Sequence, residues 1–234
     1  MLEVEGVDAF YGEFQVLRGV SLRLEAGELV VLVGPNGHGK STLLKTICGL
    51  LRPAAGSIRF EGREIGGLPP ETIVELGITY VAEERHLFPG MSVLKNLILG
   101  AYNRNARPRR EENLEYVFGL FPRLRERAHQ LASTLSGGEA RMLAMARGLM
   151  SNARVLALDE PSLGLAPKLR HEVFEIIREI HRRGTGIVLV EQSIPQVAEL
   201  ANRIYLVEEG EIVFSGDRRQ ALSNETLREA LLGM

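Results

Sequence analysis

Cysteine, long apolar runs and net charge are all scarce in this chain of 234 residues. Its single cysteine, Cys48, excludes an intramolecular disulfide, and its apolar surroundings at residues 43–51 predict that it packs in the core. The longest apolar runs, such as residues 29–33 and 155–158, fall far short of the ~20 residues that a membrane-spanning helix requires. The N-terminus lacks the basic and apolar segments of a signal peptide. These absences predict a cytoplasmic protein.

Charge is balanced, with 28 basic and 30 acidic side chains and a formal net charge of −2. A protein whose main partner is nucleic acid usually carries an excess of Lys and Arg, so we expect no nucleic-acid partner. Arginines cluster only locally, at residues 104–110 and 123–127, where the pattern favours a solvated helical surface over a phosphate-binding patch.

Hydrophobic patterning predicts strands that alternate with helices. Residues 1–33 predict short strands separated by turns at Gly12 and at residues 26–27. Continuous apolar runs predict buried strands, and apolar residues at helical spacing predict helices. We expect strands at residues 29–33, 155–158 and 186–190, helices at about residues 40–50, 173–180, 196–201 and 225–232, and a hairpin at residues 204–207 and 211–214. This alternation predicts a mainly parallel sheet with helices on both faces.

Residues 85–152 interrupt the alternation, because their apolar positions recur at helical spacing. We therefore predict a single domain that consists of a core, residues 1–84 and 153–234, and an inserted helical subdomain, residues 85–152. The chain ends at Met234, soon after the last predicted helix, so we expect no additional regulatory domain.

A phosphate-loop motif, Gly-Pro-Asn-Gly-His-Gly-Lys-Ser-Thr, lies between a predicted strand and a predicted helix. Its glycines let backbone N–H groups converge on phosphate oxygens at the positive end of the helix. Lys40 would reach the β- and γ-phosphates, and the Ser41 hydroxyl would ligate Mg²⁺. An accidental match arises in only about one chain in a hundred of this length, so the motif predicts nucleotide binding. The expected nucleotide contacts are Gly34, Pro35, Asn36, Gly37, His38, Gly39, Lys40, Ser41 and Thr42.

A second motif ends the predicted strand at residues 155–158 with two carboxylates, Asp159 and Glu160. Alone it would be an acidic turn. In a chain that has a phosphate loop, Asp159 would hold Mg²⁺, and Glu160 would orient and deprotonate the attacking water.

A third motif, Leu-Ser-Gly-Gly-Glu at residues 135–139, opens a predicted helix. Ser136 can cap this helix, and Gly137 and Gly138 leave its first amides accessible to an anion. Alone the motif would be an ordinary helix N-cap, but its position shortly before the Asp159 strand predicts a second anion site in addition to the phosphate loop.

Along the chain the phosphate loop comes first, Leu-Ser-Gly-Gly-Glu second and the Asp159–Glu160 pair third. This order resembles the ATPase subunits of ATP-binding-cassette (ABC) transporters, over essentially the whole chain. The resemblance implies an α/β fold: a P-loop NTPase core with a mainly parallel sheet, an N-terminal antiparallel β subdomain and a helical insertion subdomain. It implies a head-to-tail dimer in which residues 136–138 of one subunit close on the ATP held by Lys40 of the other. It also implies that Tyr11 stacks on adenine and that residues 162–165 communicate across the dimer.

Segments at residues 88–89, 120–124, 160–167 and 190–192 are similar to the LivF type of branched-chain amino-acid importer ATPase. This similarity implies an ATPase that energises import and uses ATP and Mg²⁺. The implied partners are a second ATPase subunit (a sister or the same chain), transmembrane permeases and, indirectly, a solute-binding protein. The implied location is peripheral, on the inner face of the cell membrane. The alternatives are a urea or short-amide importer, a non-transport cassette ATPase and a nucleotide-binding module that no longer hydrolyses ATP.

Three positions depart from the pattern of most cassettes. Glu83 stands where Gln is usual, so the expected Mg²⁺ ligand there adds a negative charge. Gln192 stands where His is usual, and an amide cannot titrate. We therefore expect Glu160 to carry catalysis with Lys40, while Gln192 positions the γ-phosphate; Glu83 and Gln192 both recur in the branched-chain importers. His38 replaces a small residue, and we expect only its backbone N–H to contact the nucleotide.

Overall fold

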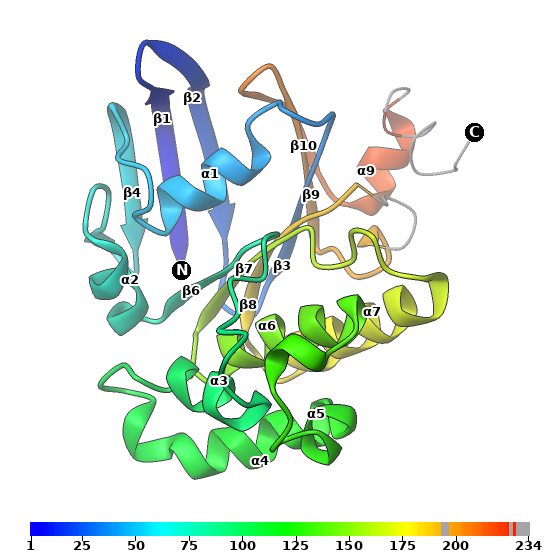
Figure 1. The fold of residues 1–234 in the computed structure, drawn as a ribbon. Helices are drawn as coiled ribbons and strands as arrows, with labels where there is room; N and C mark the ends of the chain where they lie inside the picture. Colours follow the sequence, from blue (N-terminus) through cyan, green and yellow to red (C-terminus); the bar gives the residue numbers. More distant parts are fainter. Residues whose placement is uncertain (193–196, 225–226, 228–234) are drawn as a thin grey trace.

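The computed structural model describes residues 1–192, 197–224 and 227, which are organised around two sheets (Figure 1). The first sheet is antiparallel, with the strand order β2-β1-β4-β5. This sheet confirms the expected N-terminal antiparallel β subdomain. Its strands are β1 (Leu2–Tyr11), β2 (Phe14–Leu24), β4 (Ala55–Phe60) and β5 (Arg63–Glu64).

β1 and β2 contain 10 and 11 residues, so the expectation of several short strands in this region is wrong. Their pairing extends from Leu2 opposite Leu24 to the turn at Gly12, with register shifts along the way. Gly6 and Gly19 have φ angles of 59° and 58° in these strands. A glycine at a bulge lets a strand continue past an irregular pair. The two strands end only at the predicted turns, at Gly12 and at residues 26–27.

The second sheet has the order β10-β9-β3-β8-β7-β6 and is parallel except for the pairing of β10 with β9. Every residue of β3, β7 and β8 is buried, which explains their continuous apolar sequences. The antiparallel β9–β10 pair confirms the expected hairpin. The strands are β3 (Leu29–Val33), β6 (Ile78–Val81), β7 (Val155–Asp159), β8 (Gly186–Val190), β9 (Arg203–Glu208) and β10 (Glu211–Gly216).

Helices cover both faces of the second sheet, and α1 (Lys40–Ile47) lies between the two sheets (Figure 1). Val30 of β3 belongs to the core that α1 shares with the antiparallel sheet. The next residue, Val31, belongs to a second core with α6 (Gly137–Leu149) and α7 (Pro167–Arg182). Side chains alternate between the faces of a strand, so one apolar strand serves both cores. Two further helices are α2 (Pro70–Leu76) and α9 (Arg218–Ser223).

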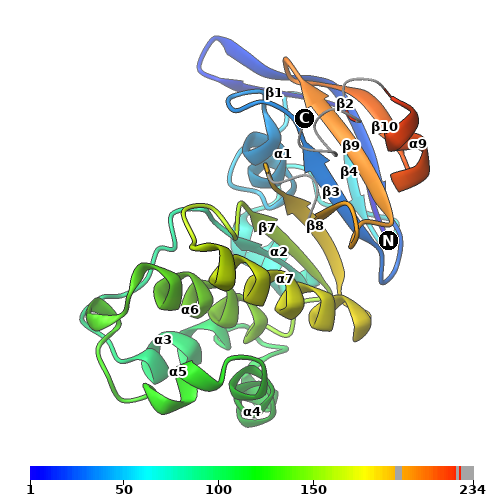
Figure 2. The ribbon, with the colours of Figure 1, turned by 90° about the vertical axis from the view of Figure 1, so that its right-hand side faces the viewer.

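The region between β6 and β7 is mainly helical, as expected, and Figure 2 shows it on the side of the molecule away from β1 and β2. The boundaries at residues 85 and 152 stay a prediction. The expected helix at 225–232, except Leu227, and the start of the helix expected at 196–201 lie outside the described residues. Within the described ranges, no helix is long and apolar enough to cross a membrane. Besides α6, this region contains α3 (Val93–Gly100), η1 (Arg107–Arg109), α4 (Arg110–Leu120), α5 (Pro122–Glu126) and η2 (Ala132–Thr134).

A close approach of α3 to α6 gives a test of this packing. A Cβ atom at Gly100 would lie 2.1 Å from the backbone oxygen of Arg147, whereas one at Gly119 in α4 would meet no described atom within 4 Å. We expect Gly100→Ala to lower the free energy of unfolding by about 1–3 kcal/mol through overpacking. The control Gly119→Ala should raise it by roughly 0.5–1 kcal/mol, since Ala favours a helix. Urea unfolding measures both, and equal effects of the two variants would show that the helices can separate freely.

Candidate active site

The phosphate-loop motif forms a tight turn between β3 and α1. Gly34, Gly37 and Gly39 have φ angles of 139°, 82° and 102°, values that residues with a side chain rarely adopt. A Cβ atom at Gly34 would also lie 2.1 Å from the backbone oxygen of Val207. No side chain among the described residues caps α1 at Gly39, so its first backbone N–H groups are donors for a ligand.

Lys40, the first residue of α1, is buried, and its Nζ donates to the carbonyl oxygens of Gly34 and Pro35, both at 2.8 Å. Burial lowers the pKa of Lys40, while the carboxylates of Glu160 and Asp159 act in the opposite direction. The ammonium group therefore lies within the loop that is expected to bind phosphate, with two acidic side chains nearby.

Asp159, at the end of β7, accepts two hydroxyl hydrogen bonds. Ser41 Oγ donates to its Oδ1 at 2.9 Å, and Tyr80 Oη donates to its Oδ2 at 2.7 Å. Burial and the hydrogen bond to Asp159 both raise the pKa of Tyr80, which keeps the phenol protonated as a donor. Tyr80 was not expected at the site. Its signal is weak, since it is one aromatic residue in β6, three positions before Glu83.

Glu160 follows Asp159 directly, but its carboxylate forms a hydrogen bond with Gln192 and not with Ser41 or Tyr80. Its φ angle of 46° is uncommon for a residue with a side chain, and such strain clusters at functional sites. Gln192 Nε2 donates to Glu160 Oε2 at 2.5 Å. The left-handed conformation thus separates two adjacent carboxylates, so that each has its own set of contacts.

A cavity of about 380 Å³ gathers most of the expected site residues. Leu163, from the loop after β7, also lines it. This loop is the segment that the family resemblance implies in communication between subunits. The expected residues that line the cavity are Asn36, Gly37, Gly39, Lys40, Ser41, Thr42, Glu83, Glu160 and Gln192.

The oxygen atoms of Ser41, Asp159 and Glu83 are suitable ligands for Mg²⁺, which prefers hard oxygen ligands. Ser41 Oγ and Asp159 Oδ1 lie 2.9 Å apart, and adjacent ligands of an octahedral ion with 2.0–2.1 Å bonds are also about 2.9 Å apart. Burial raises the pKa of Glu83, and the charges of Glu160 and Asp159 raise it further. A divalent cation would relieve this excess of negative charge. Among the described residues, no three Asp, Glu, His or Cys side chains form a metal site alone, so water and phosphate would complete the shell.

Other expected residues do not line this cavity in the described part of the chain. Tyr11 is 49% exposed at the end of β1. Ser136 and Gly137 are exposed at the start of α6, where Ser136 Oγ accepts a hydrogen bond from the backbone N–H of Glu139 and caps the helix. Gly138 follows them and is buried. The residues predicted to form a second anion site therefore do not line the cavity that holds the phosphate loop.

The side chain of His38 also lies outside the cavity. Its Nδ1 accepts a hydrogen bond from the backbone N–H of Glu209 at 3.0 Å, and its carbonyl oxygen accepts one from Gly210 at 3.1 Å. The imidazole thus links the phosphate loop to the β9–β10 turn through its Nδ1 atom. That only the backbone N–H of His38 contacts the nucleotide stays a prediction.

Glu191 is a buried carboxylate that was not expected at the site. Its Oε1 accepts from the backbone N–H of Ser162 at 2.9 Å, and its Oε2 accepts from that of Gln192 at 3.2 Å. Burial raises the pKa of Glu191. It links the loops after β7 and β8, and an acidic residue at the end of a buried strand was the available signal.

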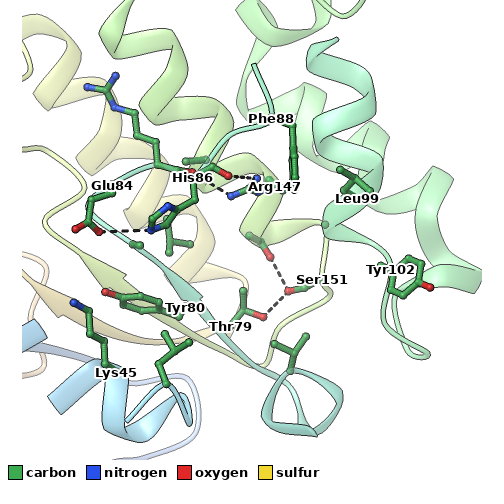
Figure 3. A pocket seen from close by; sticks show the side chains of 18 residues that line it. Lys45, Thr79, Tyr80, Glu84, His86, Phe88, Leu99, Tyr102, Arg147 and Ser151 are labelled. Carbon is green, nitrogen blue, oxygen red and sulfur yellow. Dashed lines mark hydrogen bonds and ion pairs between the residues drawn. The ribbon is translucent and has the colours of Figure 1, made fainter. Parts of the chain in front are cut away.

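A larger cavity of about 790 Å³ lies between α1, β6, α3 and α6 (Figure 3). The loop after β6 serves both cavities, because Glu83 lines the smaller and Glu84 the larger. Arg147 of α6 donates to the carbonyl oxygens of His86 and Arg85 at 2.7 and 3.1 Å. Exposed apolar side chains line this larger cavity, namely Leu50, Phe88, Leu99 and Tyr102.

Comparisons with known proteins agree with this geometry. The chain is 45% identical over 233 residues to the high-affinity branched-chain amino acid transport ATP-binding protein BraG of Pseudomonas aeruginosa, with all of both chains covered. It is 35% identical to a probable branched-chain amino acid transport ATP-binding protein, LivF, of Archaeoglobus fulgidus, covering 100% and 99% of the two chains.

Solved structures show the same fold. A nucleotide-free ATP-binding cassette from an ABC transporter matches with a TM-score of 0.85 at 28% identity, and a cassette in an ADP conformation matches with 0.82 at 28%; each match covers 100% of this chain and 99% of the other. Residues 17–163 match the family model described as ABC transporter. The chain therefore belongs to the ABC transporter family.

Proposed function

We propose that this chain is the ATP-hydrolysing subunit of an ABC importer for branched-chain amino acids. The observation that carries the proposal is the smaller cavity, where a phosphate loop, a carboxylate for the metal and a carboxylate for the water meet. The solute class is supported by relatives at 45% and 35% identity that are named for branched-chain amino acid transport.

The phosphates of ATP would bind the backbone N–H groups of Gly34 and residues 36–39 and the ammonium group of Lys40. Lys40 would exchange its hydrogen bonds to the carbonyl oxygens of Gly34 and Pro35 for phosphate oxygens. This exchange is favourable because a charged acceptor forms the stronger hydrogen bond. Tyr11 would stack on adenine from the β1–β2 hairpin.

Ser41, Asp159 and Glu83 would hold Mg²⁺ at the phosphates. Mg²⁺, when bound, neutralises negative charge on the β- and γ-phosphate oxygens. Tyr80 would orient the Asp159 carboxylate, since its hydroxyl occupies one lone pair of Oδ2 and leaves Oδ1 toward Ser41. The hydroxyl bonds thus place the carboxylate before any ligand arrives.

Glu160 would be the general base. Its carboxylate takes a proton from water while the water oxygen bonds to the γ-phosphorus and the bond to the β–γ bridging oxygen breaks, which releases ADP and phosphate. Gln192 orients the carboxylate through its 2.5 Å hydrogen bond and can turn its amide toward the γ-phosphate. An amide cannot accept the proton at neutral pH, so within this hydrogen-bonded pair Glu160 would be the base.

A second ATPase subunit would complete the site. Ser136 and Gly137 are exposed and do not line the cavity in the described part of the chain. A head-to-tail dimer would bring these residues of one subunit to the ATP of the other. The partner subunit is either a second copy of this chain or a sister ATPase.

The larger cavity would receive a cytoplasmic segment of a transmembrane permease. Tyr102 is 82% exposed at its rim, and exposed apolar side chains that gather at one groove mark an interaction site (Figure 3). The loop that carries Glu83 into the smaller cavity also lines this groove with Glu84 and His86. Movement of the permease segment and occupancy of the ATP site would therefore act on the same loop.

The role of Glu160 can be tested directly. We expect Glu160→Gln to lower steady-state ATP hydrolysis by roughly 10²–10⁴-fold, the usual contribution of a general base. Binding of a fluorescent ATP analogue should be retained. Gln192→Ala should slow hydrolysis less, because the base remains.

In proteoliposomes with the permeases and binding protein, the wild-type chain should drive uptake of leucine but not of urea, and Glu160→Gln should drive neither. Near-normal turnover by Glu160→Gln would contradict the assignment.

Mixing two inactive variants tests whether the ATP site is shared. Lys40→Ala removes the phosphate contact, and Ser136→Arg obstructs the surface that would close on the partner's ATP. In a mixed head-to-tail dimer one of the two sites is intact, so an equal mixture should regain about a quarter of the wild-type ATPase rate, while each variant alone stays inactive. The absence of any recovery would indicate that the second half-site comes from the sister ATPase.

Permease docking at the larger cavity, called the groove below, can be tested with a pair of matched leucines. Leu99 in the groove and Leu222 in α9 are both 37% exposed on helices. Leu99→Asp is expected to abolish permease-dependent leucine uptake, since a buried carboxylate opposes docking, and to leave ATP binding by the isolated chain unchanged. Leu222→Asp should support normal uptake. Equal loss of uptake in both variants would argue against docking at the groove.

A further inference from the structure

Arg141 is a buried arginine on α6 that the reaction scheme leaves without a role. Its side chain is only 4% exposed. Nη1 donates to the carbonyl oxygen of Glu83, and Nη2 donates to that of Leu163 at 3.5 Å. Glu83 and Leu163 both line the smaller cavity, so one guanidinium group ties two walls of the candidate active site to α6.

The burial of Arg141 is not explained by stability alone. Burial lowers the pKa of Arg141, and Arg85 lowers it further, whereas the carboxylates of Glu83, Glu191 and Glu160 raise it. Its Nε has no hydrogen-bond partner among the described residues. Burying a cation with an unpaired donor is costly, so an apolar side chain would fill this space at lower cost. The hydrogen bonds that Arg141 does form are directed at the two loops of the site.

Arg147, on the same helix, provides a comparison within the molecule. It also donates to two backbone carbonyl oxygens, those of Arg85 and His86. These carbonyls belong to residues that line the larger cavity. Both arginines therefore hold the loop after β6 against α6, but Arg141 does so on the side of the ATP site and Arg147 on the side of the groove.

We propose that Arg141 is a positioning residue that sets the place of the Glu83 carboxylate and thereby the affinity of the ATP site for Mg²⁺. The inference rests on the proposed function, because it takes Glu83 as a metal ligand. The planar guanidinium suits the task, since its two Nη groups reach two carbonyl oxygens at once, which a single ammonium group cannot do in the same geometry. Arg141 acts through Glu83 and Leu163 and touches no ligand itself. Residues that orient metal ligands typically contribute about 10–100-fold to metal affinity.

The test measures binding, so it does not depend on hydrolysis. A fluorescent ATP analogue is titrated onto the full chain in EDTA and at increasing Mg²⁺, which gives the Mg²⁺ concentration at half-saturation. We expect Arg141→Gln to raise this concentration roughly tenfold or more. Affinity in EDTA should not change, since β3, α1 and the phosphate loop are untouched. Arg141→Lys, which keeps the charge but cannot bridge both carbonyls, should behave like Arg141→Gln and serves in its place if that variant does not fold.

Two controls separate positioning from a general structural role. Arg147→Gln removes a half-buried arginine that holds the same loop to the same helix and should retain the wild-type Mg²⁺ dependence. In a Glu83→Ala background, which has no side-chain ligand at this position, Arg141→Gln should have little further effect on the Mg²⁺ dependence. Wild-type Mg²⁺ dependence in Arg141→Gln, an equal shift in Arg147→Gln, or full additivity with Glu83→Ala would each overturn the inference. A wild-type chain that binds no ATP would instead overturn the proposed function, and this inference with it.

Discussion

The parallel alignment of β3, β8 and β7 is the constraint on which the candidate active site depends. In the strand register, Leu32 of β3 and Asp159 of β7 are both level with Val190 of β8. The strands therefore end together, and the segments that follow them meet at one edge of the sheet. This explains how Ser41 and Asp159, 118 positions apart in the sequence, form a hydrogen bond without a long loop.

The alternation of side chains along β7 then gives the neighbouring carboxylates of Asp159 and Glu160 different contacts. Ala157 and Asp159 lie on the same face of the strand, the face that packs toward α1, and Tyr80 of β6 is paired in register with Ala157. Asp159 thus meets hydroxyl groups from α1 and from β6. Glu160 lies beyond the strand in a left-handed conformation and meets Gln192 instead. Strain at one backbone position gives the two carboxylates separate environments.

Much of this arrangement could be predicted from local sequence, and the remainder could not, for a physical reason. Glycine spacing and continuous apolar runs are local properties, so the phosphate loop, the buried strands and the Asp159–Glu160 pair could be identified as motifs. Tyr80 and Arg141 contribute through contacts that depend on strand register and on the packing of α6, which no local pattern encodes. The turns at Gly12 and at residues 26–27 were predicted, but the lengths of β1 and β2 were not, because the register shifts that let each strand continue depend on its pairing with another strand.

The loop after β6 lines both cavities, and hydrogen bonds to its backbone carbonyl oxygens hold it against α6. In this loop Arg141 and Arg147 donate to the backbone carbonyl oxygens of residues 83, 85 and 86, so these hydrogen bonds do not depend on the side chains there. Phe88 alone adds a side-chain contact among those described, since the Arg147 guanidinium lies 5.9 Å from the centroid of its ring. The two arginines themselves could not be replaced, because no shorter side chain could place its donors at these carbonyl oxygens. The helix that supplies these donors begins at Ser136 and Gly137, the exposed residues expected to meet the partner's ATP. A shift of α6 toward a partner subunit must therefore displace Glu83 in one cavity and Glu84 in the other, or break these hydrogen bonds.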